Sequence, residues 1–448
     1  MSRDTTVTER YMERAGRIQG PASEKELDGY YGGYAPRPVF LSAGEVQQLS
    51  RDLAVLRGAL FRLPRLLFDG DLGAFARANG MGRTQVRVIE RASAGVPNPP
   101  TSMGRADLYA DRSGFRLMEY NMGSTIGFDS GDICRGIMEN AGFRRFAEEE
   151  GLQHVDTLTE QVRTFRQEMG LAPGDRPVIA HVEWSAYIEK NLPYMSTLCR
   201  RWRAHGLDVT PCHVGQLERR HGRLWLEDRP VDIVYRQFLI EDLVDDDAEA
   251  RLEPLLGALE NGEVRMFTSL ESELCGSKAS LGMLSERANR HLFSAEELDV
   301  IDRLLPWTTS VTSGPVVLED GTETVLLDHA VAERHELILK PTLLHGGQGV
   351  VPGWSPDLTP EGWRGLLLDA LDGPYVLQRR IHPVPEPFPD PDGGSRPWIV
   401  NWGVVTMASG YGGLFNRCAP VDGGPDVLNL DRGALIGSGF HAGPTPRT

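Results

Sequence analysis

The sequence predicts a mixed α/β protein whose two or three substructures share a cleft. Its 448 residues are too many for one ordinary hydrophobic core. The first hundred residues have a helical and irregular pattern, and a strand–helix–strand order follows further on. That order is typical of a parallel α/β layer. We therefore expect a helical N-terminal region over 1–100, an α/β region over 101–261 and a third region over 262–448.

The N-terminal region should contain one long packing helix. Ser42 and Glu45 form a capping-box pattern, in which each side chain binds the other residue's backbone N–H. Apolar residues then recur at helical spacing from Val46 to Leu60. We expect this helix to end before Pro64.

The middle region should carry the parallel layer. The stretch 177–184 is a predicted buried strand, followed by a helix over about 192–204 and a second strand over 207–211. Two further strands are expected at 223–227 and 231–238, joined by a turn at 228–230.

The third region should begin with a strand at 264–268 and continue with capped helices and more strands. Ser294 and Glu297 form a second capping box, and Pro360 suits the first position of a helix capped by Thr359. Further strands are expected at 336–340, 375–381, 398–407 and 414–418.

The charge balance excludes some partners. Lys+Arg is 47 and Asp+Glu is 63, so the formal net charge is −16, which repels nucleic acid and anionic membrane surfaces. The first residues lack the apolar core of a signal peptide, and no apolar run is long enough to span a bilayer, so we expect a cytoplasmic protein. The five cysteines form no Cys-x-x-Cys pair, so neither a zinc site nor a disulfide framework is indicated.

The most informative motif is a predicted β-hairpin over 105–121. Its strands alternate, and the loop Arg112–Gly114 separates them, with Gly114 suited to a positive φ. This register pairs Asp107 with Glu119 and Arg105 with Asn121. Opposed carboxylates about 5 Å apart repel each other unless a cation lies between them. Hard oxygen ligands suit magnesium, so we expect a Mg²⁺ site at Asp107, Glu119 and Asn121. The alternative is a solvent-facing hairpin with scattered charges.

Two of the four lysines stand where phosphates would need a compact positive charge. Lys278 lies at the first turn of a predicted helix, and Lys340 lies on a strand that leads into the glycine-rich loop 344–350. Successive glycines let backbone N–H groups converge on an anion. The loop matches neither the Walker pattern nor the dinucleotide fingerprint. Beside Lys340 it indicates a triphosphate site, for which the candidate loop residues are Gly346, Gly347, Gln348 and Gly349.

Together these motifs resemble the ATP-grasp ligases, in the circularly permuted form of glutathionylspermidine synthase-like proteins. The resemblance covers roughly residues 101 to 420, and the hairpin is its most specific part. It rests on the following segments: Arg105–Asp107, Glu119–Asn121, Ser277–Ala279, Leu339–Pro341, Gly346–Gly349 and Tyr375–Gln378, with further likeness at Val231–Arg236 and Leu305–Thr308.

The resemblance implies a circularly permuted ATP-grasp fold, with a pre-ATP-grasp α/β layer and a nucleotide-binding region over 262–448. It implies that ATP and two Mg²⁺ ions bind, the metals at the hairpin and the phosphates or adenine at Lys278 and Lys340. The segment around Gln378 would offer backbone hydrogen bonds to the adenine. Arg105 would stabilise charge on the transferring phosphoryl group, and Arg417 is a weaker candidate for a catalytic cation.

The implied activity is that of an ADP-forming acid–amino-acid ligase, which forms an amide through an acyl phosphate. The leading hypothesis joins the γ-carboxylate of glutamate to a small, non-proteinogenic amino acid such as L-propargylglycine, in specialised metabolism such as antibiotic biosynthesis. The resemblance includes no amidase domain before the ligase, and this weakens the hypothesis of a polyamine substrate. The alternatives are a glutathionylspermidine synthase-like polyamine ligase, a phosphotransferase of the same fold and a non-catalytic nucleotide-binding module. In all of these the expected partners are small molecules, with no nucleic acid and no membrane.

Overall fold

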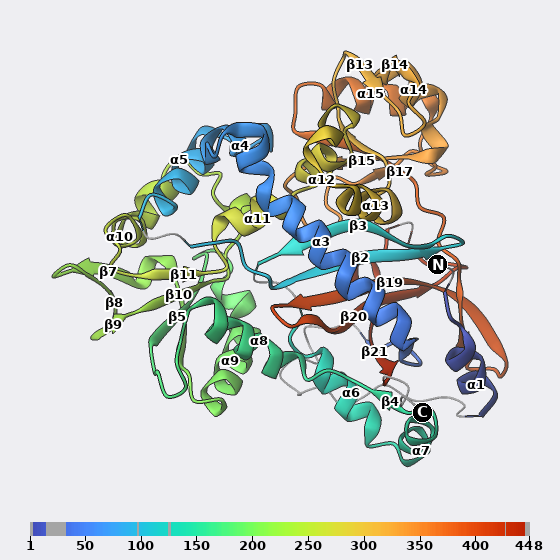
Figure 1. The fold of residues 1–448 in the computed structure, drawn as a ribbon, viewed down its shortest axis with the longest axis horizontal. Coiled ribbons are helices and arrows are strands. Elements are labelled where there is room, and N and C mark those ends of the chain that lie inside the picture. Colours follow the sequence, from blue (N-terminus) through green and yellow to red (C-terminus); the bar gives the residue numbers. More distant parts are fainter. Residues whose placement is uncertain (1–2, 15–32, 96–97, 124–126, 426, 444–448) are drawn as a thin grey trace.

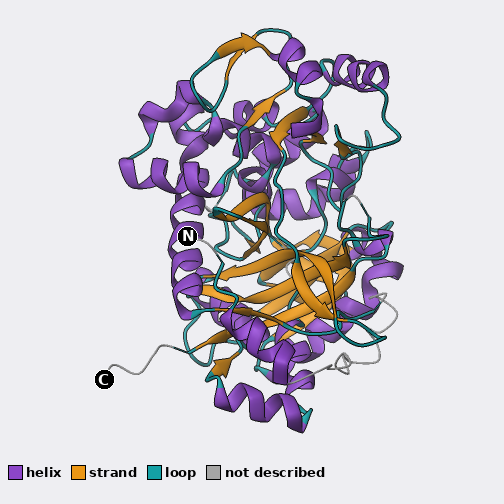
Figure 2. Cartoon of the chain, turned by 90° about the vertical axis from the view of Figure 1, so that its right-hand side faces the viewer, coloured by secondary structure: helices purple, strands orange, loops and turns teal. Residues whose placement is uncertain are grey.

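The computed structural model describes residues 3–14, 33–95, 98–123, 127–425 and 427–443. Within these residues, three larger sheets organise the chain: an eight-stranded central sheet, a four-stranded parallel sheet and a four-stranded antiparallel sheet in a separate lobe (Figure 1). Helices pack against the central sheet, as the side view shows (Figure 2). The predicted mixed α/β class is confirmed.

The central sheet combines strands from distant parts of the chain. Its path is β1-β21-β20-β19-β2-β3, with β18 paired to β19 and β4 paired to β21. The predicted hairpin is therefore joined through β2 to strands near the end of the sequence. The strands are β1 (Val39–Leu41), β2 (Gly104–Asp111), β3 (Gly114–Met122), β4 (Leu152–Gln153), β18 (Glu386–Pro389), β19 (Ser395–Met407), β20 (Gly410–Pro420) and β21 (Leu435–Ala442).

The long helix α3 (Ala43–Phe68) runs across the central sheet (Figure 1). Both hydrogen bonds of the predicted capping box at Ser42 and Glu45 are present. The helix does not end before Pro64 but continues to Phe68, because Pro64 packs in the buried face and Asp69 ends the helix in a left-handed conformation. The other helices of this region are α1 (Thr6–Arg14), α4 (Leu72–Ala78) and α5 (Arg83–Ala92).

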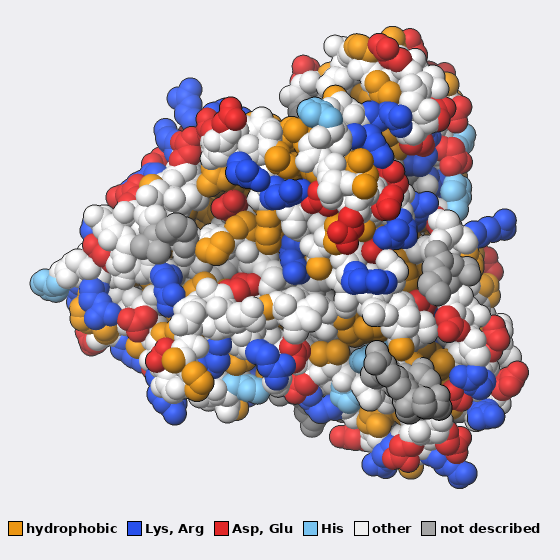
Figure 3. Space-filling view, in the orientation of Figure 1, with side chains coloured by type: hydrophobic (Ala, Val, Ile, Leu, Met, Phe, Trp, Pro, Cys, Tyr) orange, Lys and Arg blue, Asp and Glu red, His pale blue; other side chains and the backbone are white. Residues whose placement is uncertain are grey.

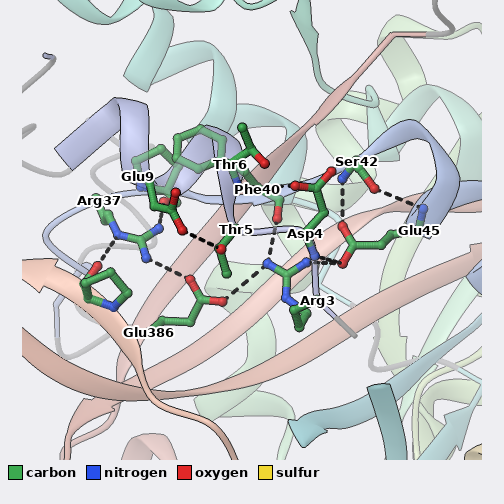
Figure 4. A network of polar contacts seen from close by, with 12 residues as sticks. Arg3, Asp4, Thr5, Thr6, Glu9, Arg37, Phe40, Ser42, Glu45 and Glu386 are labelled. Carbon is green, nitrogen blue, oxygen red and sulfur yellow. Dashed lines mark hydrogen bonds and ion pairs between the residues drawn. The ribbon is translucent and has the colours of Figure 1, made fainter. Parts of the chain in front are cut away.

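A buried polar network ties the first residues to the rim of the central sheet (Figure 4). Arg37 donates to Glu386 over 3.0 Å, and Arg3 contacts both Glu386 and Glu45. The Arg3 guanidinium also lies 4.3 Å from the ring centroid of Trp402, within the range of a cation–π contact. Paired charges are the form in which ions are tolerated in an interior.

The parallel sheet has the order β11-β10-β5-β6, and every pair in it is parallel, as the strand–helix–strand pattern predicts. The strand expected at 264–268 pairs with β10, so strand pairing crosses the boundary expected between 261 and 262. The elements are β5 (Val178–Glu183), β6 (Asp208–His213), β10 (Ile233–Arg236), β11 (Arg265–Phe267), α8 (Thr157–Glu168), α9 (Ile188–Ala204) and α10 (Ala248–Glu260), with a side sheet of β7 (Leu217–Arg220), β8 (Arg223–Leu226) and β9 (Arg229–Val231).

The lobe above the central sheet has an apolar core of its own, which includes Leu326, Trp363 and Leu377 (Figure 1). Its antiparallel sheet has the order β12-β17-β15-β16. The caps predicted at Ser294 and Thr359 both form. The elements from α11 onward are α11 (Leu270–Gly276), α12 (Lys278–Ser285), α13 (Ala295–Leu304), β12 (Thr308–Ser310), β13 (Pro315–Val317), β14 (Glu323–Val325), α14 (Leu326–Ala332), β15 (Leu337–Pro341), β16 (Val351–Pro352), α15 (Pro360–Ala370) and β17 (Tyr375–Arg379).

The remaining helices α6 (Ser130–Met138) and α7 (Ala141–Glu149) lie beside β21 and β4, at the edge of the central sheet. Among the residues that the structure describes, no helix is both long and apolar enough to cross a membrane. On the face shown in Figure 3, acidic and basic side chains are interspersed among the coloured residues.

Candidate active site

The hairpin of β2 and β3 has the predicted register at its four candidate site residues. Asp107 lies opposite Glu119, and Arg105 lies opposite Asn121. The loop is shorter than expected, because Asp111 already pairs with Gly114, whose φ is +136°. A bulge between Asp107 and Leu108 then shifts the register by one residue. Two deviations from the prediction thus cancel, and the four side chains come together as predicted.

Asp107 is fully buried and is held by three side chains around it. Arg105 donates from Nε to Oδ1 over 2.8 Å, and Asn121 donates from Nδ2 to Oδ2 over 2.9 Å. Arg417 approaches the same Oδ2 from β20, with its Nη2 at 2.5 Å. Burial alone would lower the pKa of Arg105, but Asp107 raises it above its ordinary value. Asp107 therefore fixes both arginines predicted to act in catalysis.

Glu119 faces the lobe across the cleft and meets its lysines. The Nζ of Lys278 lies 3.5 Å from its Oε2, and the Glu119 side chain keeps 25% of its surface exposed. Burial would raise the pKa of Glu119, but Lys278, Lys340 and Arg417 together lower it well below its ordinary value. The carboxylate is thus charged at neutral pH and stands among three cations.

Lys340 projects from β15 toward the hairpin. Its Nζ donates to Gln378 Oε1 over 2.6 Å and to the backbone carbonyl of Met118 over 3.3 Å. Gln378 in turn donates from Nε2 to Thr308 Oγ1 over 3.1 Å. Burial lowers the pKa of Lys340 to about 8. The amide of Gln378 thereby orients the ammonium group toward the central sheet.

The backbone of Gln378 itself pairs with strands on both sides. β17 lies between β12 and β15, and Gln378 is in register with a residue of each neighbour. Its backbone is therefore inside the sheet. The segment Arg379–Ile381, which begins at the last residue of β17, lines the cleft.

A cleft of about 430 Å³ lies between the central sheet and the lobe. Predicted site residues line it from both sides, whereas Asp107 is buried beneath the surface and Gln348 and Gly349 do not reach the lining. The predicted residues that line the cleft are Arg105, Glu119, Asn121, Lys278, Lys340, Gly346, Gly347, Gln378 and Arg417.

The glycine-rich loop between β15 and β16 borders this cleft and is tethered on three sides. Lys278 donates from Nζ to the carbonyl of Leu344 over 2.9 Å, and Asn429 donates to the carbonyl of Gly346. Gly346 and Gly347 have φ of +64° and +73°, which other residues rarely adopt. A residue with a side chain would therefore be strained at either position.

The third tether of the loop is His345, which was not singled out as a functional residue from the sequence. Its backbone N–H donates to Glu241 over 3.1 Å, and its Nε2 lies 3.6 Å from Glu273. Glu273 also binds Arg236, at the end of the parallel strand β10, over 2.9 Å. Glu273 raises the pKa of His345 above its ordinary value, although burial acts in the opposite direction. His345 thus connects the loop to the parallel sheet.

No family model matches this chain, and no curated protein matches its sequence. The structure is similar to that of a glutathione synthetase-like effector from Globodera pallida in its apo form, with a TM-score of 0.53 and 12% identity over 98% of this chain and 94% of that one. The chain has an ATP-grasp-type fold. A putative gamma-glutamylcysteine synthetase from Methylobacillus flagellatus is a second structural match, with a TM-score of 0.45 and 14% identity over 85% of this chain and 87% of that one.

Within this ATP-grasp-type fold, the donors on β2 and β3 fit magnesium. Among the described residues, no three histidine, cysteine or acidic side chains converge closely enough to hold a metal alone. The available protein ligands are two carboxylates and one amide, of which Glu119 and Asn121 line the cleft. Magnesium takes oxygen ligands and commonly keeps water and substrate phosphates in its coordination shell. Such a partial protein shell therefore suits a metal that arrives with a nucleotide.

Proposed function

We propose that this chain is an ATP-dependent carboxylate–amine ligase of the circularly permuted ATP-grasp type. The observation that carries the proposal is the convergence of Glu119 from the central sheet with Lys278 and Lys340 from the lobe, at one cleft. A metal-bound triphosphate is stabilised by carboxylates that bind the metal on one wall and by cations that bind the phosphates on the other. The proposed permutation follows the chain order, in which the hairpin with the acidic residues precedes the lobe.

In this proposal Glu119, Asn121 and Asp107 hold Mg²⁺, which when bound neutralises charge on the phosphate oxygens. Lys278 and Lys340 contact the phosphates from the other wall. Asp107 is bound by Arg105 at Oδ1 and by Arg417 at Oδ2, so its part in metal binding requires Arg105 to turn from Oδ1 toward the phosphates. Released in this way, Arg105 would lie beside the phosphoryl group during transfer.

The reaction has two steps. A carboxylate oxygen of the first substrate attacks the γ-phosphorus of ATP, and the bond to the bridging oxygen breaks, giving an acyl phosphate and ADP. The nitrogen of an amine then attacks the acyl carbon, the carbon–oxygen bond breaks, and phosphate leaves as the amine loses a proton. The chain contributes positioning and charge stabilisation. The glycine-rich loop would exclude water that hydrolyses the acyl phosphate.

The proposed carboxylate substrate is glutamate, through its γ-carboxylate, and the proposed amine is a small amino acid. The sequence resemblance supports this choice, and the similarity to a structure described as glutathione synthetase-like is compatible with it. The acceptor amine is a prediction from the resemblance alone, including a non-proteinogenic amino acid such as L-propargylglycine.

The test is incubation of the full chain with ATP, Mg²⁺ and a mixed pool of amino acids and polyamines, followed by phosphate assay and mass spectrometry. The proposal predicts stoichiometric ADP, free phosphate and a new product whose mass is that of two substrates minus water. A product that retains phosphate would instead identify a phosphotransferase. Binding of ATP without any turnover would favour a non-catalytic module, and Glu119→Gln serves as the control for contaminating ATPase.

A further inference from the structure

Asn401 lies on the floor of the cleft, on β19, directly opposite Arg417 of β20. It is 3% exposed, and its Oδ1 accepts no hydrogen bond from any described residue. The Nε of Arg417 is likewise buried and without an acceptor in the described chain. Buried polar atoms nearly always have partners. An unpaired acceptor and an unpaired donor side by side in a cleft therefore point to a ligand.

The two residues are direct neighbours, but these two atoms do not bond to each other. Directly opposed residues in an antiparallel pair have Cβ atoms about 5 Å apart. The Arg417 guanidinium is turned toward Asp107, with its Nη2 2.5 Å from Oδ2. The Nε of Arg417 and the Oδ1 of Asn401 thus each still lack a hydrogen-bond partner within the part of the chain that the structure describes.

Asn401 lies where the surroundings of β19 change from polar to apolar. Side chains two residues apart on a strand face the same side, so Ile399, Asn401 and Gly403 share one face. Gly403 lies opposite the charged Asp107, whereas Ile399 lies opposite Ala419. Along β19 the surroundings therefore change from the buried charge of Asp107, through the neutral polar Asn401, to the apolar Ile399. A nucleoside triphosphate has the same order in its phosphates, ribose and base.

We propose that Asn401 is a specificity-determining residue that accepts a hydrogen bond from a ribose hydroxyl of ATP, an inference that rests on the proposed function. The Nε of Arg417 donates to an oxygen of the same ribose. A hydroxyl group donates and accepts at once, so one sugar satisfies both buried atoms. Asn401 thereby selects a ribonucleotide over one that lacks these hydroxyls.

The test compares binding of ATP and of 2′,3′-dideoxy-ATP, each with Mg²⁺, by calorimetry on the full chain. The matched control is Asn416→Leu, because Asn416 is also buried with unpaired side-chain atoms but does not line the cleft. A lost neutral hydrogen bond corresponds to about a 3- to 10-fold weaker affinity. We expect the wild type and Asn416→Leu to bind ATP more tightly than 2′,3′-dideoxy-ATP by this factor. Asn401→Leu should bind the two nucleotides with equal affinity. Asn401→Asp keeps the acceptor and should retain the preference.

An unchanged preference in Asn401→Leu would overturn the inference. Should that variant fail to fold, Asn401→Ala allows the same comparison. A wild type that binds both nucleotides equally would overturn the inference alone and leave the proposed function intact. A wild type that binds neither nucleotide would overturn both.

Discussion

Lys340 donates a hydrogen bond from Nζ to the backbone carbonyl of Met118 over 3.3 Å, and so joins the lobe to the central sheet. Met118 is the residue that the bulge in β3 leaves without a partner in β2. A bulge disrupts the ladder at one residue and frees its backbone groups. The same bulge that aligns Glu119 with Asp107 therefore gives Lys340 its contact in the sheet.

Replacing Lys340 by methionine should weaken ATP binding strongly while leaving the fold intact. Methionine keeps the length of the side chain but loses the charge that would contact a phosphate. A charge-assisted hydrogen bond contributes roughly 1.5–3 kcal/mol, so we expect about a 10- to 100-fold higher Kd by calorimetry. The matched control is Lys190→Met on α9, whose lysine is exposed and far from the cleft residues in sequence. Equal affinities for the two variants would refute a role for Lys340.

Gly403 should not tolerate a side chain, because the backbone of β20 lies directly against it. A Cβ at this position would lie 1.9 Å from the carbonyl oxygen of Phe415 and 3.0 Å from Cδ of Arg105. We expect Gly403→Ala to destabilise the chain by about 1–3 kcal/mol in denaturant unfolding. Gly58→Ala, in helix α3 with no atom within 4 Å of the added Cβ, should instead be neutral or stabilising. Similar unfolding midpoints for the two variants would contradict this packing.

The tether at His345 should make stability depend on pH. Glu273, Glu241 and Lys278 surround the ring, and the net effect raises the pKa of His345 above its ordinary value. Its contribution is therefore fully present below the pKa of an unfolded histidine, about 6.5, and is lost as the pH rises through the higher folded value. The wild type should unfold at a higher temperature than His345→Gln at pH 6, and this difference should shrink by pH 8.5. If the difference in unfolding temperature instead grew with pH, a raised pKa of His345 in the folded state would be contradicted.

Short-range patterns predicted much of this molecule correctly. The caps at Ser42 and Ser294 depend on side chains three residues apart, and both formed as expected. The register of the hairpin followed from alternation, although its loop is shorter than expected and a bulge compensates. The predicted end of α3 was wrong. Proline usually ends a helix, but Pro64 is buried in the tertiary packing and the helix continues past it.

The pairing of strands that are far apart in the sequence could not be predicted. Asn401 reaches the cleft only because β19 pairs with both β2 and β20, and no local pattern marks that pairing. His345 gains its partners because the loop packs against α11 and the segment around Glu241. Conversely, Gln348 and Gly349 belong to the predicted motif but do not line the cleft.

The most direct test of the central claim is transfer of oxygen from a carboxylate to phosphate. The chain is incubated with ATP, Mg²⁺ and amino acids whose carboxylates carry ¹⁸O, and the released phosphate is analysed by mass spectrometry. Activation through an acyl phosphate predicts one ¹⁸O atom in each phosphate, because the attacking carboxylate oxygen leaves with it. Phosphate released without ¹⁸O would show that water, and not a carboxylate, attacks ATP, and would contradict the proposed ligase.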